Sequence, residues 1–184
     1  MSPVEHEVNP WRTISTRVVY QNPWITVRED QVITPGGSPG IYGVIETRVA
    51  TAVAALTPRN EIYLVGQHRY PTSCYSWELI EGGSEEGEDP LAAAQRELAE
   101  EAGLIATEWQ ELGGEVHLSN CISAEVGRLF VARGLSEVTA RPDDTERLTV
   151  RCVPLAEAVA MVDSGEIKDA ISIIGILRLA RLGL

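Results

Sequence analysis

A helix with clear boundaries is predicted at residues 90–102, and it restricts what the rest of the chain can form. Asp89 offers a side-chain acceptor of the kind that caps helix N-termini, and Pro90 suits the first helical position. Gly103 suits the left-handed conformation in which many helices end. The apolar residues recur at helical spacing and form one stripe: Leu91, Ala94, Leu98 and Ala102. This stripe needs a sheet or another helix to cover it.

Strand-length runs flank this helix on both sides. Alternating or continuous apolar runs between turn residues predict strands at residues 14–20, 24–33, 39–46, 49–56, 61–70, 74–80, 124–132 and 147–153. Two more helices are expected at 154–165 and 168–182. The order of strands and helices predicts a mixed α/β or α+β domain. Residues 1–46 are expected to form a strand arm, and residues 47–184 the main domain.

Composition excludes several classes of protein. The formal net charge is −12, and no basic stripe is present, so a nucleic-acid partner is not expected. An anionic substrate would need a cation between it and this acidic chain. The three cysteines are far apart and show neither a disulfide nor a metal-ligand spacing. The N-terminus lacks the regions of a signal peptide, and the apolar tail is interrupted by Arg178 and Arg181. A cytoplasmic protein without a membrane partner is expected.

Three glutamates crowd the end of the predicted helix. Glu97, Glu100 and Glu101 stand at i, i+3 and i+4, where like charges repel. The helix macrodipole also disfavours anions at this end. A solvated acidic face is one interpretation of such a charge run. The other is a site for Mg²⁺ or Mn²⁺, since these hard cations take carboxylate ligands and would convert the repulsion into binding.

The segment with these glutamates resembles the signature of the Nudix hydrolases. GGSEEGEDPLAAAQRELAEEAGL, residues 82–104, fills every fixed position: Gly82, five residues, Glu88, seven residues, then Arg96-Glu97-Leu98, any residue, Glu100-Glu101, any residue, Gly103-Leu104. The wider resemblance, from about Trp11 to the C-terminus, is to the ADP-ribose pyrophosphatase and nucleotide-sugar branch. It implies a Nudix α/β/α sandwich with a mixed sheet, preceded by an N-terminal antiparallel strand arm.

The resemblance implies roles for the residues of this segment. Glu97, Glu100 and Glu101 match the family's metal ligands, as does the backbone carbonyl of Glu81. Glu81 departs from the small or apolar residue common at its position, although a carbonyl ligand does not depend on the side chain. Structural roles are expected for Gly82, Glu88, Arg96 and Gly103, with Arg96 holding the Gly-rich loop on the helix.

A general base is also required, to take a proton from the attacking water. The branch has a glutamate on a loop near the end of the domain, and Glu146 in PDDTERLTV matches that role. An acidic surface turn is the alternative interpretation of this segment. Glu100 or Glu101 is the alternative base.

Five further residues are expected to contact the substrate. Arg69 matches a position that contacts phosphate or the distal ribose, and Arg48 one near the nucleobase. Glu78 would bind sugar hydroxyls or pair with an arginine. Trp24 is the arm residue expected to stack on the base, although aromatic residues more often fill cores. Glu125 would join the metal or substrate shell.

The expected activity is divalent-cation-dependent hydrolysis of the pyrophosphate bond in ADP-ribose or a related nucleoside diphosphate sugar. The products would be a nucleoside monophosphate and a sugar phosphate. The ADP-ribose subgroup has a proline in the loop after its signature, whereas HLSNCISAE, residues 117–125, has none, so a GDP-hexose is an alternative substrate. A nucleoside triphosphate pyrophosphohydrolase and a non-catalytic nucleotide-binding module are the other candidates. Dimers of this branch often exchange the arm, so a homodimer through the arm is expected.

Overall fold

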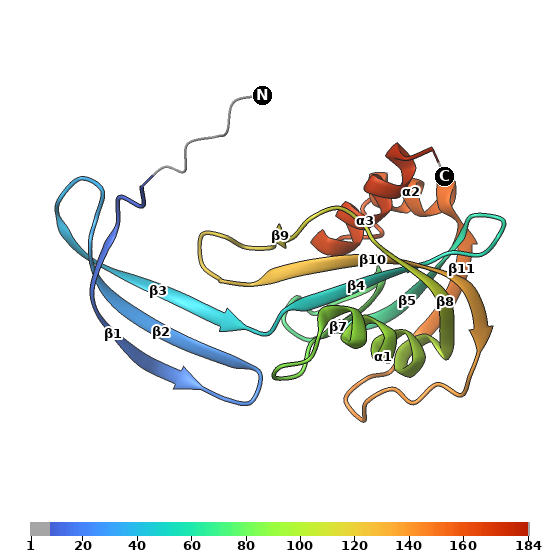
Figure 1. Ribbon diagram of the computed structural model, residues 1–184, viewed down its shortest axis with the longest axis horizontal. Helices are drawn as coiled ribbons and strands as arrows, with labels where there is room; N and C mark the ends of the chain where they lie inside the picture. Colours follow the sequence, from blue (N-terminus) through green and yellow to red (C-terminus); the bar gives the residue numbers. More distant parts are fainter. Residues whose placement is uncertain (1–7, 184) are drawn as a thin grey trace. The chain divides into compact units, whose positions relative to one another are not determined.

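The computed structural model describes residues 8–183, which form two compact units (Figure 1). The first unit contains the described residues up to 47 together with 119–125, and the second contains 48–118 and 126–183. The N-terminal segment, in which no signal peptide is expected, lies largely outside the described residues. Within residues 8–183, no helix combines the length and the apolar character needed to cross a bilayer.

Three antiparallel strands make up most of the first unit. Their order is β1-β2-β3, with bounds β1 (Arg12–Gln21), β2 (Ile25–Ile33) and β3 (Pro39–Thr47). The loop 119–125 joins them through a parallel bridge between Ile45 and Ser123. All residues of β1 are exposed. Among the described residues, this edge strand pairs only with β2, and no layer covers it. A three-stranded sheet of this kind has little core of its own.

Two sheets form the centre of the second unit. The larger has the order β7-β4-β10-β8, with β9 also paired to β10, and the smaller has the order β11-β5-β6. The first contains β4 (Ala50–Ala55), β7 (Ile80–Gly83), β8 (Leu104–Glu111), β9 (Val116–His117) and β10 (Val126–Glu137). The second contains β5 (Glu61–Arg69), β6 (Cys74–Glu78) and β11 (Thr149–Pro154). Only β4 and β10 run parallel, so the larger sheet is mixed, as predicted.

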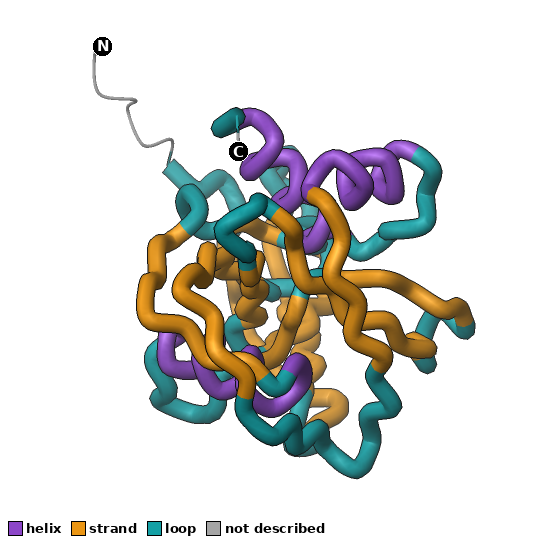
Figure 2. Tube along the Cα trace, turned by 90° about the vertical axis from the view of Figure 1, so that its right-hand side faces the viewer, coloured by secondary structure: helices purple, strands orange, loops and turns teal. Residues whose placement is uncertain are grey.

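Helices cover both faces of these sheets: α1 (Pro90–Ala102) on one, α2 (Leu155–Asp163) and α3 (Ala170–Arg181) on the other (Figure 2). Strand β4 shows why two layers are needed. Val53 packs with the residues under α1, whereas Ala52 and Ala54 pack with those under α2 and α3. Successive side chains of a strand point to opposite faces, so β4 is buried on both. The predicted fold class is confirmed.

Helix α1 begins and ends where its capping residues predict. The Asp89 carboxylate accepts hydrogen bonds from the backbone N–H groups of Leu91, at 3.0 Å, and Ala92, at 3.3 Å. Gly103 ends the helix at φ 64°. The buried face is displaced from the predicted apolar stripe, however: it comprises Ala93, Ala94, Glu97, Leu98 and Glu101. The interpretation as a solvated acidic face is therefore wrong for two of the three glutamates.

Candidate active site

Glu101 is the most deeply buried of the helix glutamates, with 2% of its surface exposed. Its Oε2 accepts a hydrogen bond from the backbone N–H of Glu81 at 3.1 Å, while its buried Oε1 has no hydrogen-bond partner within residues 8–183. Burial raises the pKa of Glu101 to about 8. A buried carboxylate oxygen without a partner costs free energy unless a cation or a proton occupies the position beside it. This oxygen is the structural observation that fits a divalent cation.

Glu97 lies against the first glycine of the signature. A Cβ on Gly82 would come within 2.0 Å of the Glu97 carboxyl group, so only glycine allows the strand to approach this side chain so closely. Burial is the main cause that raises the pKa of Glu97. The Arg96 guanidinium offsets part of this effect by donating to Glu97 Oε1 at 2.6 Å.

Arg96 joins the Gly-rich loop to α1. Its Nε and Nη2 donate to the two oxygens of Glu88, at 3.2 and 3.1 Å. Its Nη2 also donates to the Gly83 carbonyl at 3.0 Å. Arg96 also donates to Glu100 Oε2 at 3.0 Å. The paired Arg96 lowers the pKa of Glu88, and Glu88 in turn accepts from the backbone N–H of Glu85. These contacts are those of a structural residue that orders the loop.

The backbone of Glu81 faces the same site. Glu81 stands opposite Ala52 on β4, and its N–H donates to the Glu101 side chain and not to the backbone of β4. Opposed residues of an antiparallel pair alternate between bonded and non-bonded positions, and the N–H and C=O of one extended residue point to the same side. The Glu81 carbonyl is therefore directed to the side on which Glu101 lies, as a ligand contributed by the backbone requires.

The Glu81 side chain points elsewhere. It accepts a hydrogen bond from the Ser172 hydroxyl on α3. Burial, and then the nearby negative charge of Asp169, raise the pKa of Glu81 well above its usual value. Sequence reasoning identified neither Ser172 nor Asp169. The spacing Asp169-x-x-Ser172, which is typical of a helix N-terminus, was the one available signal.

The donor set suits a hard cation, although its carboxylates do not form a ready-made cage. Within residues 8–183, no group of three or more acidic, histidine or cysteine side chains converges tightly enough to hold a metal ion. Arg96 engages Glu97 and Glu100, and the Glu81 N–H engages Glu101. Carboxylate and carbonyl oxygens are nevertheless the ligands that Mg²⁺ and Mn²⁺ prefer. Binding would require Glu97 and Glu100 to turn from Arg96 towards the ion.

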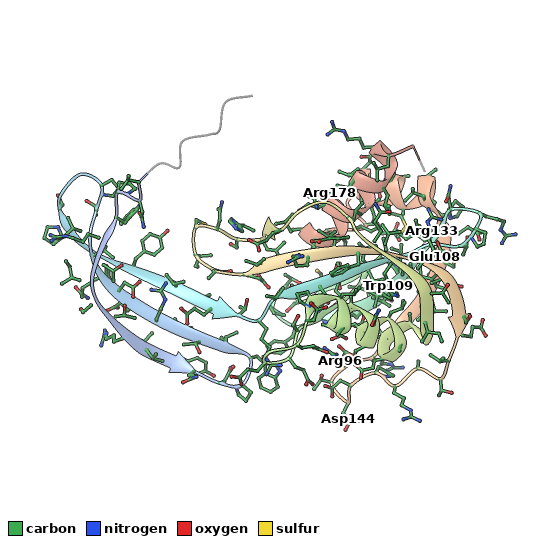
Figure 3. The ribbon with its side chains drawn as sticks, in the orientation of Figure 1. Arg96, Glu108, Trp109, Arg133, Asp144 and Arg178 are labelled. Carbon is green, nitrogen blue, oxygen red and sulfur yellow. The ribbon has the colours of Figure 1, made fainter. Side chains whose placement is uncertain are left out.

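Glu146 lies close to this group. Its loop is tied to the end of α1, because the Arg141 N–H donates to the Glu100 carbonyl at 2.9 Å. After burial, the Glu146 charge is among the causes that raise the pKa of both Glu97 and Glu101. Its own Oε2 accepts from the backbone N–H of Asp143 at 3.2 Å. Figure 3 shows Arg96 on α1 and Asp144 in this loop at the same edge of the second unit.

The predicted substrate residues divide between the two units. Arg69 on β5 forms a bidentate pair with Glu78 on β6, whose side chain is buried, so the structure brings these two together. Arg48 lies beside Gly83 in the second unit. Trp24, 70% exposed, and Glu125 belong to the first unit.

A cavity of about 320 Å³ lies apart from the acidic site. Trp109, Phe130, Arg128 and the first residues of α1 line it, at the opposite end of that helix from the glutamates. None of the predicted site residues contributes to this cavity.

Two family models match adjacent parts of the chain. The nucleoside diphosphate sugar hydrolase N-terminal domain matches residues 11–45, and the NUDIX domain matches residues 46–172. The chain belongs to the Nudix family. Its Nudix signature, recognised from residues 82–104, is thereby confirmed.

Individual relatives of the chain include ADP-ribose pyrophosphatases. The chain is 36% identical to an ADP-ribose pyrophosphatase of Mycobacterium tuberculosis, across 94% of this chain and 83% of that one. It is 30% identical to a methanol dehydrogenase activator of Bacillus methanolicus, across 90% of each chain. A solved structure described as an ADP compounds hydrolase has a TM-score of 0.82 at 18% identity and covers 97% of this Nudix chain and 96% of that one. At this identity, the structural match shows the fold.

Proposed function

We propose that this Nudix protein hydrolyses the pyrophosphate bond of ADP-ribose or a related nucleoside diphosphate sugar, with Mg²⁺ or Mn²⁺. The products are a nucleoside monophosphate and a sugar phosphate. The observation that carries the proposal is the buried Glu101 carboxylate within a complete Nudix signature: its Oε2 accepts from the Glu81 N–H, and its Oε1 has no hydrogen-bond partner among the described residues. Relatives that are ADP-ribose pyrophosphatases support the substrate class.

The acidic group would hold the metal. Glu97, Glu100, Glu101 and the Glu81 carbonyl are the proposed ligands. When bound, a divalent cation neutralises pyrophosphate oxygens and activates water for attack on phosphorus. The net charge of −12 makes such a cation necessary, since the chain would otherwise repel the substrate.

Glu146 is the proposed general base. Its Oε2 accepts from the Asp143 N–H, which leaves Oε1 to take the proton of the attacking water. Glu101 is a weaker candidate, because one oxygen accepts from the backbone and the other is enclosed. Glu100 is the remaining candidate, with 43% of its side chain exposed. Replacing each glutamate by glutamine separates these roles, since loss of the base lowers kcat without weakening Mn²⁺ binding.

The Arg69–Glu78 pair is the proposed recognition element for the distal part of the substrate. Arg69 would donate to a phosphate or ribose oxygen, with its orientation set by the bidentate contact to Glu78. Arg48, Trp24 and Glu125 remain predictions for contacts to the base and sugar. The missing proline in residues 117–125 keeps a GDP-hexose as an alternative to ADP-ribose.

The activity is tested by incubating the purified protein with Mg²⁺ and a panel of substrates. The panel contains ADP-ribose, ADP-glucose, GDP-mannose, UDP-glucose and nucleoside triphosphates, with products identified by chromatography. We expect a nucleoside monophosphate from at least one nucleotide sugar. Release of inorganic pyrophosphate from triphosphates alone would identify a triphosphate pyrophosphohydrolase instead. The match of residues 11–45 to the nucleoside diphosphate sugar hydrolase N-terminal domain favours the sugar substrates.

A non-catalytic binding module is the other candidate, and the relative described as a methanol dehydrogenase activator keeps it relevant. The complete set of signature glutamates favours catalysis. Glu101→Gln distinguishes the two: an enzyme loses most of its turnover and remains folded, whereas a module has no turnover to lose.

We also propose a homodimer formed through the first unit and a cytoplasmic location. Support for the dimer comes from β1, whose residues are all exposed although several are large and apolar. Cys74, Cys121 and Cys152 are all unpaired, which suits a reducing compartment. Fractionation of the source cells tests the location.

A further inference from the structure

Glu81 is held on the side of β7 away from α1. Its carboxylate accepts a hydrogen bond from Ser172 Oγ, and the same hydroxyl accepts from the backbone N–H of Leu79 at 2.9 Å. Ser172 is completely buried. The Ser172 hydroxyl on α3 therefore contacts both Leu79, which lies between β6 and β7, and Glu81, whose carbonyl is directed towards the acidic site.

The first turns of α3 are well placed to keep this hydroxyl fixed. Asp169 caps the helix and accepts from the Ser172 N–H at 2.8 Å, which sets the start of the helix. One turn later, a Cβ on Gly175 would lie 2.7 Å from a Leu79 methyl group, so glycine allows α3 to press against the same residue that Ser172 contacts. The position of α3 relative to Leu79 is thus set by both a hydrogen bond and close packing.

Strand β7 needs such support, because it lies at the edge of its sheet and, in the part of the chain that the structure describes, pairs with β4 alone. On its α1 side, the Glu81 N–H is bound by Glu101, which is itself a proposed ligand. The contacts from α3 are restraints on residue 81 that do not involve the metal ligands. Magnesium demands near-ideal geometry at about 2.1 Å, so small shifts of a ligand oxygen weaken binding.

We propose that Ser172 is a positioning residue that acts through the Glu81 side chain to set the Glu81 carbonyl for a divalent cation. The inference rests on the proposed metal-dependent function. Loss of the Ser172 hydroxyl removes one hydrogen-bond partner of the Glu81 carboxylate and the acceptor of the Leu79 N–H, so the packing of Gly175 on Leu79 no longer has these hydrogen bonds beside it. Outer-shell partners of metal sites typically contribute about 10-fold or more in affinity.

The test measures Mn²⁺ binding directly, by electron paramagnetic resonance of the free ion, for wild type, Ser172→Ala, Glu81→Ala and the double variant. We expect each single variant to raise the Kd for Mn²⁺ about 10-fold. For Ser172→Ala, we expect kcat at saturating Mg²⁺ to stay within about threefold of wild type, because every proposed ligand and the proposed base remain. The double variant should bind like Glu81→Ala, since residues that act through one another are not additive.

Ser164→Ala is the matched control, because the Ser164 hydroxyl, at the C-terminal cap of α2, donates to the Met161 carbonyl and its loss should leave Kd unchanged. Wild-type Mn²⁺ affinity in folded Ser172→Ala, or additive effects in the double variant, would overturn the inference and leave the proposed function intact. If Ser172→Ala does not fold, Glu81→Ala alone decides, since unchanged affinity there is equally contrary. A wild-type protein that neither binds Mn²⁺ nor hydrolyses any nucleotide sugar would instead remove the proposed function, and the inference with it.

Discussion

Gly82 makes room for a carboxylate that any other side chain would displace. Its missing Cβ would stand 2.0 Å from the Glu97 carboxyl group, whereas the nearest neighbour of a Cβ on Gly83 is 3.8 Å away. Glu97 is flexible at its tip, so Gly82→Ala should fold but move this proposed ligand. We expect its Mn²⁺ affinity to fall at least 10-fold, and kcat/KM with it. Gly83→Ala is the adjacent control, and equal effects of the two substitutions would contradict the prediction.

Glu101 should make the metal-free protein sensitive to pH. Burial raises its folded pKa to about 8 from 4.5, so between these values the folded state binds more protons than the unfolded state. The free energy of unfolding therefore falls as pH rises through this window. Glu101→Gln removes this titration. In EDTA at pH 8 the variant should be more stable than wild type by up to a few kcal/mol, at about 1.4 kcal/mol per pKa unit.

Urea unfolding of both proteins at several pH values in EDTA measures this difference. The gap should close as the pH falls below 4.5, where the wild-type carboxyl becomes protonated in the unfolded state as well as in the folded state. Glu97 and Glu81 titrate in both proteins, so only the difference between the curves reports on Glu101. If the two proteins had the same free energy of unfolding at pH 8, the Glu101 carboxyl would not be buried in the way that the structure shows.

Individual site residues differ in how far sequence could identify them. Glu97 and Glu101 stand out because like charges at i and i+4 need a reason. Their burial could not be read from periodicity, since a carboxylate on the flank of an apolar stripe is usually solvated. Ser172 was invisible for a different reason. Its spacing from Asp169 indicates a helix N-terminus, but nothing in the sequence indicates that the fold brings this serine against a strand about ninety residues earlier.

At the scale of elements, Arg96 is the cross-link between α1 and its preceding loop. It contacts Glu88, Glu97, Glu100 and the Gly83 carbonyl, with 27% of its side chain exposed. Arg96→Ala leaves three carboxylates without their cation, so we expect a loss of about 2 kcal/mol in the free energy of unfolding. Arg96→Lys should recover only part of this loss. The lysine restores the positive charge, but its single ammonium group cannot replace the bidentate contact to Glu88.

Arg59→Ala is the matched control for this change. Arg59 pairs with Glu61, but 81% of its side chain is exposed, and such surface pairs contribute less than about 1 kcal/mol. Urea unfolding without metal gives both values. Equal losses for the two variants would show that Arg96 contributes no more than a surface ion pair.

Elements were predictable where local chemistry defines them. Asp89, Pro90 and Gly103 mark the ends of α1, and both C-terminal helices occur where they were expected. Pairing between strands was not predictable, because it depends on contacts between distant segments. The sequence does not indicate, for example, that β4 pairs in parallel with β10, or that loop 119–125 belongs with the first three strands.

At the scale of the whole molecule, the first unit carries apolar surface that one chain leaves uncovered. On β1, Ile14, Val18 and Tyr20 are each more than half exposed. Edge strands of soluble proteins usually carry charge or lie under a covering element. A second copy of the chain would supply that cover, which is the physical argument for the proposed homodimer.

Val18→Glu tests this cover. Val18 is 58% exposed and stands opposite Arg28 on β2, so the single chain should accept a glutamate there without unfolding. In a dimer that buries β1, the new charge would be desolvated, and association should weaken strongly.

Light scattering should give a mass of twice 20.0 kDa for wild type and a shift towards the single-chain mass for the variant. Ser15→Glu, which adds the same charge to the same strand in place of a polar residue, should shift the equilibrium less. A wild-type protein that is monomeric at all concentrations would exclude the dimer, and β1 would then need a different covering partner.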